Sequence, residues 1–144
     1  MSVSRPRWAH RLGSLALLPF VAGAALVWLL RGAESARAAF ALGAYAATVV
    51  SFIGGIHWGL AFREAEPPVR LFVWGVVPAI VAWAALLAPA PAALVAYAVI
   101  LTLCYAVDRC VYPLHGAAHC LPLRLHLTAI AAASCLAGAA GLSV

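Results

Sequence analysis

The segment between Arg37 and Arg63 decides the fold of this chain. From Ala38 to Phe62 it reads AAFALGAYAATVVSFIGGIHWGLAF and contains no charged residue. The hydrocarbon core of a bilayer is about 30 Å thick, a distance that a helix of about 20 apolar residues crosses. Because lipid offers the backbone no hydrogen-bond partners, a crossing segment has to satisfy its own N–H and C=O groups, as a helix does. The segment is therefore predicted to be a transmembrane helix.

Four other runs have a similar length and composition. They cover residues 12–30, 71–88, 92–110 and 125–142, and only the third of these carries charge, with Asp108 and Arg109 on its last turn. Short interruptions separate the runs, so residues 1–144 are predicted to form a single transmembrane domain. The predicted fold class is all-α, a polytopic membrane bundle of five helices. Pro19 and Pro78 lie inside two of the runs and are predicted to mark bends, which packed membrane helices tolerate.

The composition of the whole chain agrees with a membrane protein. Of its 144 residues 67% are hydrophobic and 9% are charged, and the mean hydropathy is +1.05. Soluble domains are about 45–50% apolar and about 25% charged, so a soluble globule and a disordered tail are excluded. The formal net charge of +5 comes from arginines scattered singly along the chain. A nucleic-acid partner, which needs a clustered basic face, is therefore not expected.

The arginines predict how the chain is oriented. Cytoplasmic loops of membrane proteins carry the excess of Lys and Arg. In the five-helix arrangement seven arginines fall on the side of the N-terminus and two, Arg31 and Arg37, on the other. The seven are Arg5, Arg7, Arg11, Arg63, Arg70, Arg109 and Arg124. We therefore expect a cytoplasmic N-terminus, an external C-terminus and a location in a bacterial inner membrane.

A signal peptide is the alternative interpretation of the first run. Arg5 and Arg7 form a basic start, and Ala36-Arg37-Ala38 resembles a small-residue cleavage site. The apolar run from Leu12 to Leu30 is longer than the typical signal core of about 7–15 residues, which favours a retained helix.

Small residues recur at every fourth position of the second predicted helix. Such spacing lets two helix backbones approach closely, which promotes helix packing in lipid. This row predicts that the helix lies at the centre of the bundle, with its partner either inside the chain or in a second copy. The row consists of Gly43, Ala47, Ser51, Gly55 and Gly59.

Polar side chains inside apolar spans are the first candidates for function, because they are costly in lipid. His57, between glycines, is the central candidate. It could bind a metal, ligate haem, relay a proton or hydrogen-bond a quinone-like head group. It could instead pair with Asp108 or a backbone carbonyl and pin two helices together. Asp108 in turn could accept hydrogen bonds from Arg109, Arg124 or His57, or act as a proton acceptor. The candidate ligand-binding residues are His57, Trp58, Trp74, Asp108, Arg109 and His126.

A metal site is a weaker hypothesis for the segment from Cys110 to Cys120. It contains Cys110, His115, His119 and Cys120, and the two histidines are four residues apart, which would place them on one face of a helix. The spacing matches no closed zinc motif, and the alternative is a solvated loop. The sequence also lacks a P-loop, a nucleophile elbow and paired catalytic carboxylates, so an enzyme is not expected.

Several short elements of the chain resemble one known family. They are Leu18-Pro19-Phe20, then Ser51-Phe52-Ile53-Gly54-Gly55-Ile56-His57-Trp58-Gly59-Leu60, then Trp74-Gly75-Val76-Val77-Pro78 and Asp108-Arg109. In this order they are similar to the transmembrane protein 69-like family, the domain of unknown function numbered 3429. The resemblance implies a small multi-span membrane protein of bacteria or mitochondria, and it implies no reaction.

Three function classes remain open from the sequence. The first is a non-enzymatic helical bundle that scaffolds or accompanies a membrane complex, possibly a respiratory one. The second is a binder of a small amphipathic cofactor, haem or quinone, centred on His57. The third is a transporter that works as a dimer. The expected partners are the lipid bilayer and either another membrane protein or a second copy of the chain.

Overall fold

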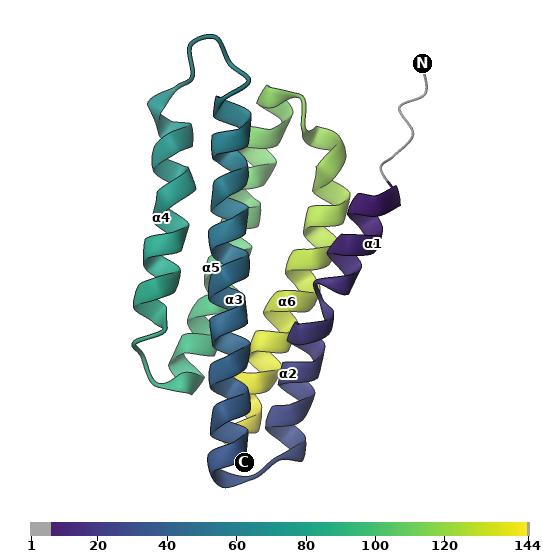
Figure 1. Ribbon diagram of the computed structural model, residues 1–144, viewed down its shortest axis with the longest axis vertical. Coiled ribbons are helices and arrows are strands. Elements are labelled where there is room, and N and C mark those ends of the chain that lie inside the picture. Colours follow the sequence, from purple (N-terminus) through teal and green to yellow (C-terminus); the bar gives the residue numbers. More distant parts are fainter. Residues whose placement is uncertain (1–6, 144) are drawn as a thin grey trace.

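The computed structural model describes residues 7–143, and within this range the chain is helical and has no strand (Figure 1). A pair of short helices begins the chain, and a pair of 3-10 helices joins the last two long helices. The elements are α1 (Arg7–Leu15), α2 (Leu18–Leu29), α3 (Gly32–Ala61), α4 (Val69–Ala85), α5 (Ala90–Val111), η1 (Tyr112–His115), η2 (Ala118–Cys120) and α6 (Leu121–Gly141). The all-α prediction is confirmed.

Within residues 7–143, four helical segments are long and apolar enough to cross a membrane, and α4 is a shorter fifth. The four segments are Trp8–Leu29, Gly32–Ala61, Ala90–His115 and Ala118–Gly141. With 17 residues, α4 has a length of about 25 Å at 1.5 Å per residue, slightly less than the hydrocarbon core. The chain is thus a multi-span helical bundle with four to five helices able to cross.

Proline explains where the first span is interrupted. The span is not one helix, because α1 ends at Leu15 and α2 begins at Leu18, with Pro19 in the first turn of α2. Proline lacks an N–H and fits a first turn, where that group has no partner in any case. Pro78, by contrast, lies inside α4, which continues past it.

The last helix begins earlier than the sequence predicted. The fifth run was expected to start at Leu125, but α6 starts at Leu121 and carries Pro122 in its first turn. Arg124 is therefore a helical residue and is buried, with 8% of its surface exposed. The predicted start at residue 125, which leaves Arg124 outside the helix, is therefore wrong, because a first-turn proline begins the helix one turn sooner.

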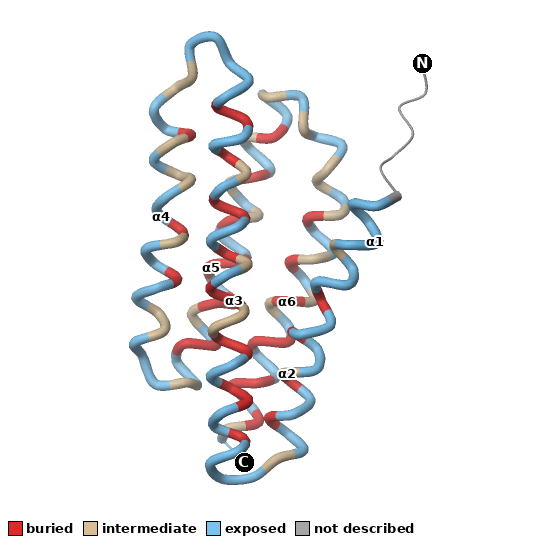
Figure 2. Tube along the Cα trace, viewed as in Figure 1, coloured by how far each residue is buried: buried red, intermediate tan, exposed pale blue. Residues whose placement is uncertain are grey.

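Helix α3 is the central helix of the bundle, since it packs against α2, α4, α5 and α6. Its buried side faces the inner sides of α5 and α6, while the outer sides of the bundle are exposed (Figure 2). Leu42, Val50, Tyr97 and Leu101 are among the core residues. The buried Tyr97 hydroxyl donates a hydrogen bond to the carbonyl oxygen of Ala82 at 2.8 Å and so ties α5 to α4.

The row of small residues on α3 divides into a buried and an exposed part. Gly43 and Ala47 are buried, whereas Ser51, Gly55 and Gly59 are exposed. The close approach to α4 is made by Gly54, since a Cβ atom there would lie 2.7 Å from the carbonyl oxygen of Gly75. The predicted row therefore does not pack helices of this chain along its whole length.

The loops are distributed over the two ends of the bundle in the way the alternating spans predict. The α3–α4 loop, η1, η2 and the start of α1 lie at one end, and the α2–α3 and α4–α5 connections lie at the other (Figure 1). Arg11 and Arg63 thus share one end, opposite Arg31 and Arg37. Arg5 and the side chain of Arg7 lie outside the described residues.

Candidate functional site

Four polar side chains are buried together among α3, α5 and α6. His57 and Asp108 are 0% exposed, Thr128 5% and Arg124 8%. Each occupies the inner face of its helix: His57 follows the buried Ile53 by one turn, and Arg124 precedes Thr128 by one turn. The helical period therefore turns these polar groups toward the bundle interior together with the apolar core.

An ion pair forms the centre of this cluster. Arg124 donates two hydrogen bonds to the same carboxylate oxygen, Oδ2 of Asp108, from Nε at 2.8 Å and from Nη2 at 2.6 Å. Its Nη1 donates to the Thr128 hydroxyl at 3.3 Å. The other carboxylate oxygen, Oδ1, lies 3.5 Å from Nε2 of His57. Burying either charge alone is costly, so each ion is kept inside the bundle by the other.

Two aromatic side chains stand beside His57. The ring of Trp74, on α4, is 6.5 Å from the imidazole between centroids, and the ring of Tyr112, on η1, is 6.1 Å away. Five buried polar atoms of this group make no hydrogen bond to the described part of the protein: both ring nitrogens of His57, Trp74 Nε1, Asp108 Oδ1 and the Tyr112 hydroxyl. Buried polar atoms are usually satisfied, so this concentration of unpaired donors and acceptors distinguishes the cluster from the rest of the core.

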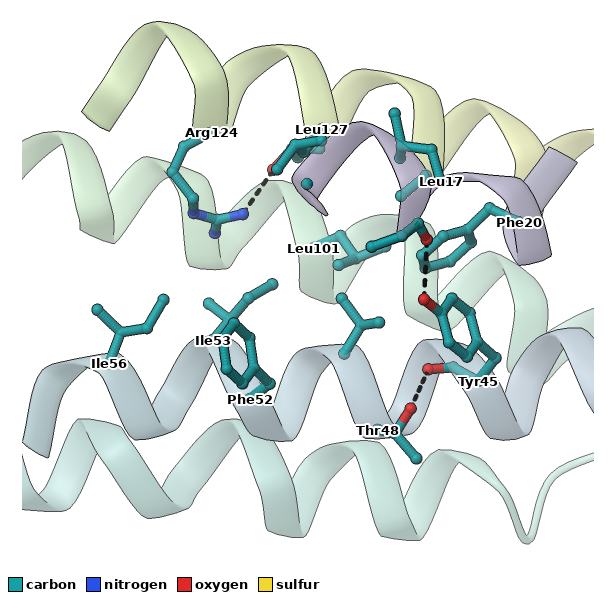
Figure 3. A pocket seen from close by; sticks show the side chains of 15 residues that line it. Leu17, Phe20, Tyr45, Thr48, Phe52, Ile53, Ile56, Leu101, Arg124 and Leu127 are labelled. Atoms are coloured by element: carbon teal, nitrogen blue, oxygen red, sulfur yellow. Dashed lines mark hydrogen bonds between the residues drawn. The ribbon is translucent and has the colours of Figure 1, made fainter. Parts of the chain in front are cut away.

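A cavity of about 430 Å³ adjoins the cluster on the side of α1 and α2. Its walls come from α1, α2, α3 and α6 with Leu101 of α5, and Arg124 and Thr128 line one of its ends. In Figure 3 the Arg124 side chain lies at that end, while Phe20 and Tyr45 lie at the other. The exposed Ala16, Thr48 and Phe52 form its rim. The cavity therefore opens sideways between the first span and α3.

The hydroxyl groups of Tyr45 and Thr48, near the apolar end of the cavity, already donate hydrogen bonds to the backbone. Tyr45 donates to the carbonyl oxygen of Ala16 at 2.8 Å, which lies at the break between α1 and α2. Thr48 donates to the carbonyl oxygen of Tyr45 at 2.7 Å. Among the described residues that line the cavity, Arg124 is the one charged side chain. Polar recognition is therefore concentrated at the Arg124 end.

The structure brings together three of the six residues predicted to bind a ligand. His57, Trp74 and Asp108 belong to the cluster. Arg109 and His126 are exposed and face away from it. Trp58 is partly exposed and donates from Nε1 to the carbonyl oxygen of Phe72 at 2.9 Å. The six predicted residues therefore do not form one site.

The sequence named Arg124 as a possible donor to Asp108, which the structure confirms, but not as a candidate ligand-binding residue. Thr128 and Tyr112 were missed. Pro122 was the available signal, because a proline favours the first turn of a helix. A helix beginning there places Arg124 and Thr128 on one face, four residues apart. Tyr112 follows the predicted end of its helix, and no pattern in the sequence marked it as buried.

A haem group does not fit these residues. His57 is the candidate axial ligand, but it is fully buried, and its Nε2 points at Asp108. It is also absent from the lining of the cavity. An uncharged head group with hydrogen-bond acceptors, such as that of a quinone, fits the Arg124 end better because that end offers N–H donors.

The predicted metal site in the Cys110–Cys120 segment is not assembled. The residues from 7 to 143 contain no group of three or more side chains that could hold a metal ion. His115 and His119 lie in different helices, η1 and η2, with Gly116 between them at φ 71°. They do not share a helix face as predicted. His115 instead contacts Glu64, with 2.8 Å between Nδ1 and Oε1, and so links η1 to the α3–α4 loop.

Comparison with known proteins gives a family. Residues 5–140 match the family described as "Protein of unknown function (DUF3429)". A curated relative, transmembrane protein 69 of Xenopus tropicalis, is 41% identical over 85 residues, which are 57% of this chain and 33% of the relative. The match thus spans about a third of that relative's length. No solved structure matches the chain. The chain is a multi-pass helical membrane protein and belongs to the DUF3429 family, which the sequence resemblance predicted.

Proposed function

We propose that this protein binds a small amphipathic molecule within the bilayer. The apolar part of the molecule would lie in the cavity between the first span, α3 and α6, and its polar head would meet Arg124. One observation carries the proposal: an apolar cavity of about 430 Å³ that ends on a buried arginine. Ligand pockets in proteins have volumes of about 300–1,000 Å³ and combine apolar walls with a few polar groups.

The Arg124 guanidinium has hydrogen-bonding capacity left for a ligand. Arg124 uses three N–H groups, two toward Asp108 and one toward Thr128. A guanidinium carries further N–H donors on its two terminal nitrogens. Since Asp108 and Thr128 fix the side chain, binding a head group there costs little additional side-chain ordering.

We expect a bulky residue at the rim to block binding. The exposed Ala16 lines the cavity, so Ala16→Trp would fill the opening without entering the core. Ala25→Trp is the matched control, because Ala25 is exposed on α2 and lies away from the cavity. The purified protein in lipid nanodiscs is irradiated with a photoreactive long-chain ketone, and mass spectrometry locates the label. Ala16→Trp should reduce labelling of cavity residues about tenfold, and Ala25→Trp should leave it unchanged.

Two results would contradict this function. One is labelling that is spread evenly over lipid-facing residues such as Phe40 and Val99, which are exposed and lie away from the cavity. The other is labelling of cavity residues that Ala16→Trp leaves at the level of the unsubstituted protein.

A scaffolding role would use the exposed side of α3 beyond the cavity, toward the α3–α4 loop. Gly55 and Gly59 are exposed on α3, and a Cβ atom added to either would meet nothing within 4 Å. A helix of another protein could approach α3 closely there, since small residues permit close backbone contact in lipid. A dimeric transporter would use the same face of α3.

A further inference from the structure

We infer that the cavity selects a molecule with an uncharged hydrogen-bond-accepting head, such as a carbonyl, over a carboxylate with the same chain. This inference rests on the proposed function and specifies the ligand class. The preference for an uncharged head follows from the pairing of charges at the Arg124 end of the cavity. The expectation of a single chain follows from the dimensions of the apolar part of the cavity.

The charge of Arg124 is already matched by Asp108. The two side chains make two short hydrogen bonds, and their exposed fractions are 10% and 0%. Other charged groups on the adjoining helices, among them Arg11 on α1 and Arg109 on α5, are exposed and do not line the cavity. The imidazole of His57 faces Asp108 from α3, and a histidine is ordinarily uncharged at pH 8. The cluster as a whole is then neutral.

A carboxylate would disturb this balance, and a carbonyl would not. An anion brought to the cavity end would be a third buried charge without a counter-ion of its own. It would also compete with Asp108 for the same guanidinium, and a buried ion pair is costly to break. A carbonyl oxygen accepts a hydrogen bond from one of the remaining N–H groups of Arg124 and leaves the charges as they are.

The dimensions of the cavity favour a single chain. The lining residues of α3 extend from Tyr45 to Ile56, a length of about 16 Å at 1.5 Å per residue. A volume of about 430 Å³ is near the lower end of the range of ligand pockets, about 300–1,000 Å³. One unbranched chain therefore fits lengthwise, with its head at Arg124 and its tail toward Phe20.

Two probes with the same photoreactive chain test the selectivity, one ending in a methyl ketone and the other in a carboxylate. They are compared at pH 8 in nanodiscs of uncharged lipid, at equal mole fraction in the lipid. In the unsubstituted protein the ketone should label the cavity about tenfold more than the acid. Asp108→Asn removes the counter-charge and should reverse this preference. Glu34→Gln is the control, because Glu34 is exposed on α3, pairs with the exposed Arg37 and does not line the cavity.

The outcomes distinguish failure of the proposed function from failure of the inference about the head group. If neither probe labels the cavity, the proposed function is overturned. If the acid labels it as well as the ketone or better, binding stands and the inference is overturned. The comparison in the unsubstituted protein decides this even if Asp108→Asn does not fold. A folded Asp108→Asn protein that still prefers the ketone would also overturn the inference.

Competition identifies the source of the uncharged head. A decyl benzoquinone that displaces the ketone probe would indicate a quinone, and a monoacyl glycerol that displaces it would indicate a lipid ester. Both competitors should act at lower concentration than a fatty acid of equal chain length.

Discussion

Asp108 connects three helices through one carboxylate. One oxygen of this α5 residue accepts both hydrogen bonds from Arg124 on α6, and the other oxygen faces His57 on α3. The pairing of His57 with Asp108 was predictable, since both are polar residues in apolar spans and such residues join helices in lipid. Arg124 was one of three possible donors to Asp108 considered from the sequence, and the structure shows that it is the one that donates. Its burial was not predicted, because its helix was expected to start one residue after it and in fact starts at Leu121.

Replacing Asp108 with alanine should destabilise the protein strongly. Arg124 would remain buried without a counter-ion, and loss of one partner of a buried pair costs about 3–5 kcal/mol. The free energy of unfolding is measured by circular dichroism during titration of mixed micelles with a denaturing detergent. Glu34→Ala breaks an exposed pair and should cost no more than about 1 kcal/mol.

A double substitution distinguishes the effect of the buried charges on the free energy of unfolding from the effect of side-chain packing. Asp108→Leu combined with Arg124→Met removes both charges and keeps apolar volume, so much of the stability lost in Asp108→Ala should return. Equal destabilisation of Asp108→Ala and Glu34→Ala would show that the ion pair contributes little.

At the scale of elements, the packing of α3 shows which contacts the row of small residues could predict. The strict four-residue spacing identified the right helix and correctly placed Gly43 and Ala47 inside. The rest of the row turns away from the core of this chain, because positions four residues apart rotate around a helix of 3.6 residues per turn. The buried row continues instead through Val50, Gly54 and His57. Composition and length were enough to predict which segments are helical. Which side chains of a helix are buried also depends on how the neighbouring helices cross it.

Adjacent glycines on α3 give a matched pair of substitutions. Gly54→Ala places a methyl group 2.7 Å from the Gly75 carbonyl oxygen, so α3 and α4 have to separate, at a cost of about 1–3 kcal/mol. Gly55→Ala meets nothing within 4 Å and should be neutral or stabilise the helix by up to about 1 kcal/mol. Thermal unfolding in detergent micelles compares the two variants. A smaller loss of stability for Gly54→Ala than for Gly55→Ala would contradict the packing of α3 on α4.

At the scale of the whole molecule, charge is divided unevenly between the two ends of the bundle. Among the described residues, Arg11, Arg63, Arg70 and Arg109 lie toward the end with the α3–α4 loop, whereas Arg31 and Arg37 lie at the opposite end. Because cytoplasmic segments hold the excess of basic residues, we propose that the end with the α3–α4 loop faces the cytoplasm of a bacterial inner membrane.

Reporter fusions test this orientation. Alkaline phosphatase, which is active outside the cytoplasm, should be active when fused after Val144 and inactive when inserted at Glu66 in the α3–α4 loop. A fluorescent protein that matures only in the cytoplasm should show the reverse pattern. Alkaline phosphatase activity at Glu66 would contradict the proposed orientation.

The interrupted first span determines the route by which a ligand would arrive. Ala16, at the interruption, and Phe52 on α3 are exposed and line the cavity within the length of the spanning segments. In a bilayer this part of a spanning helix is surrounded by acyl chains. A molecule bound as we propose would therefore reach Arg124 by lateral diffusion within one leaflet, without crossing an aqueous phase. Occupancy is then set by the mole fraction of the molecule among the surrounding lipids. A molecule that partitions strongly into the membrane fills such a site even when its intrinsic affinity is weak.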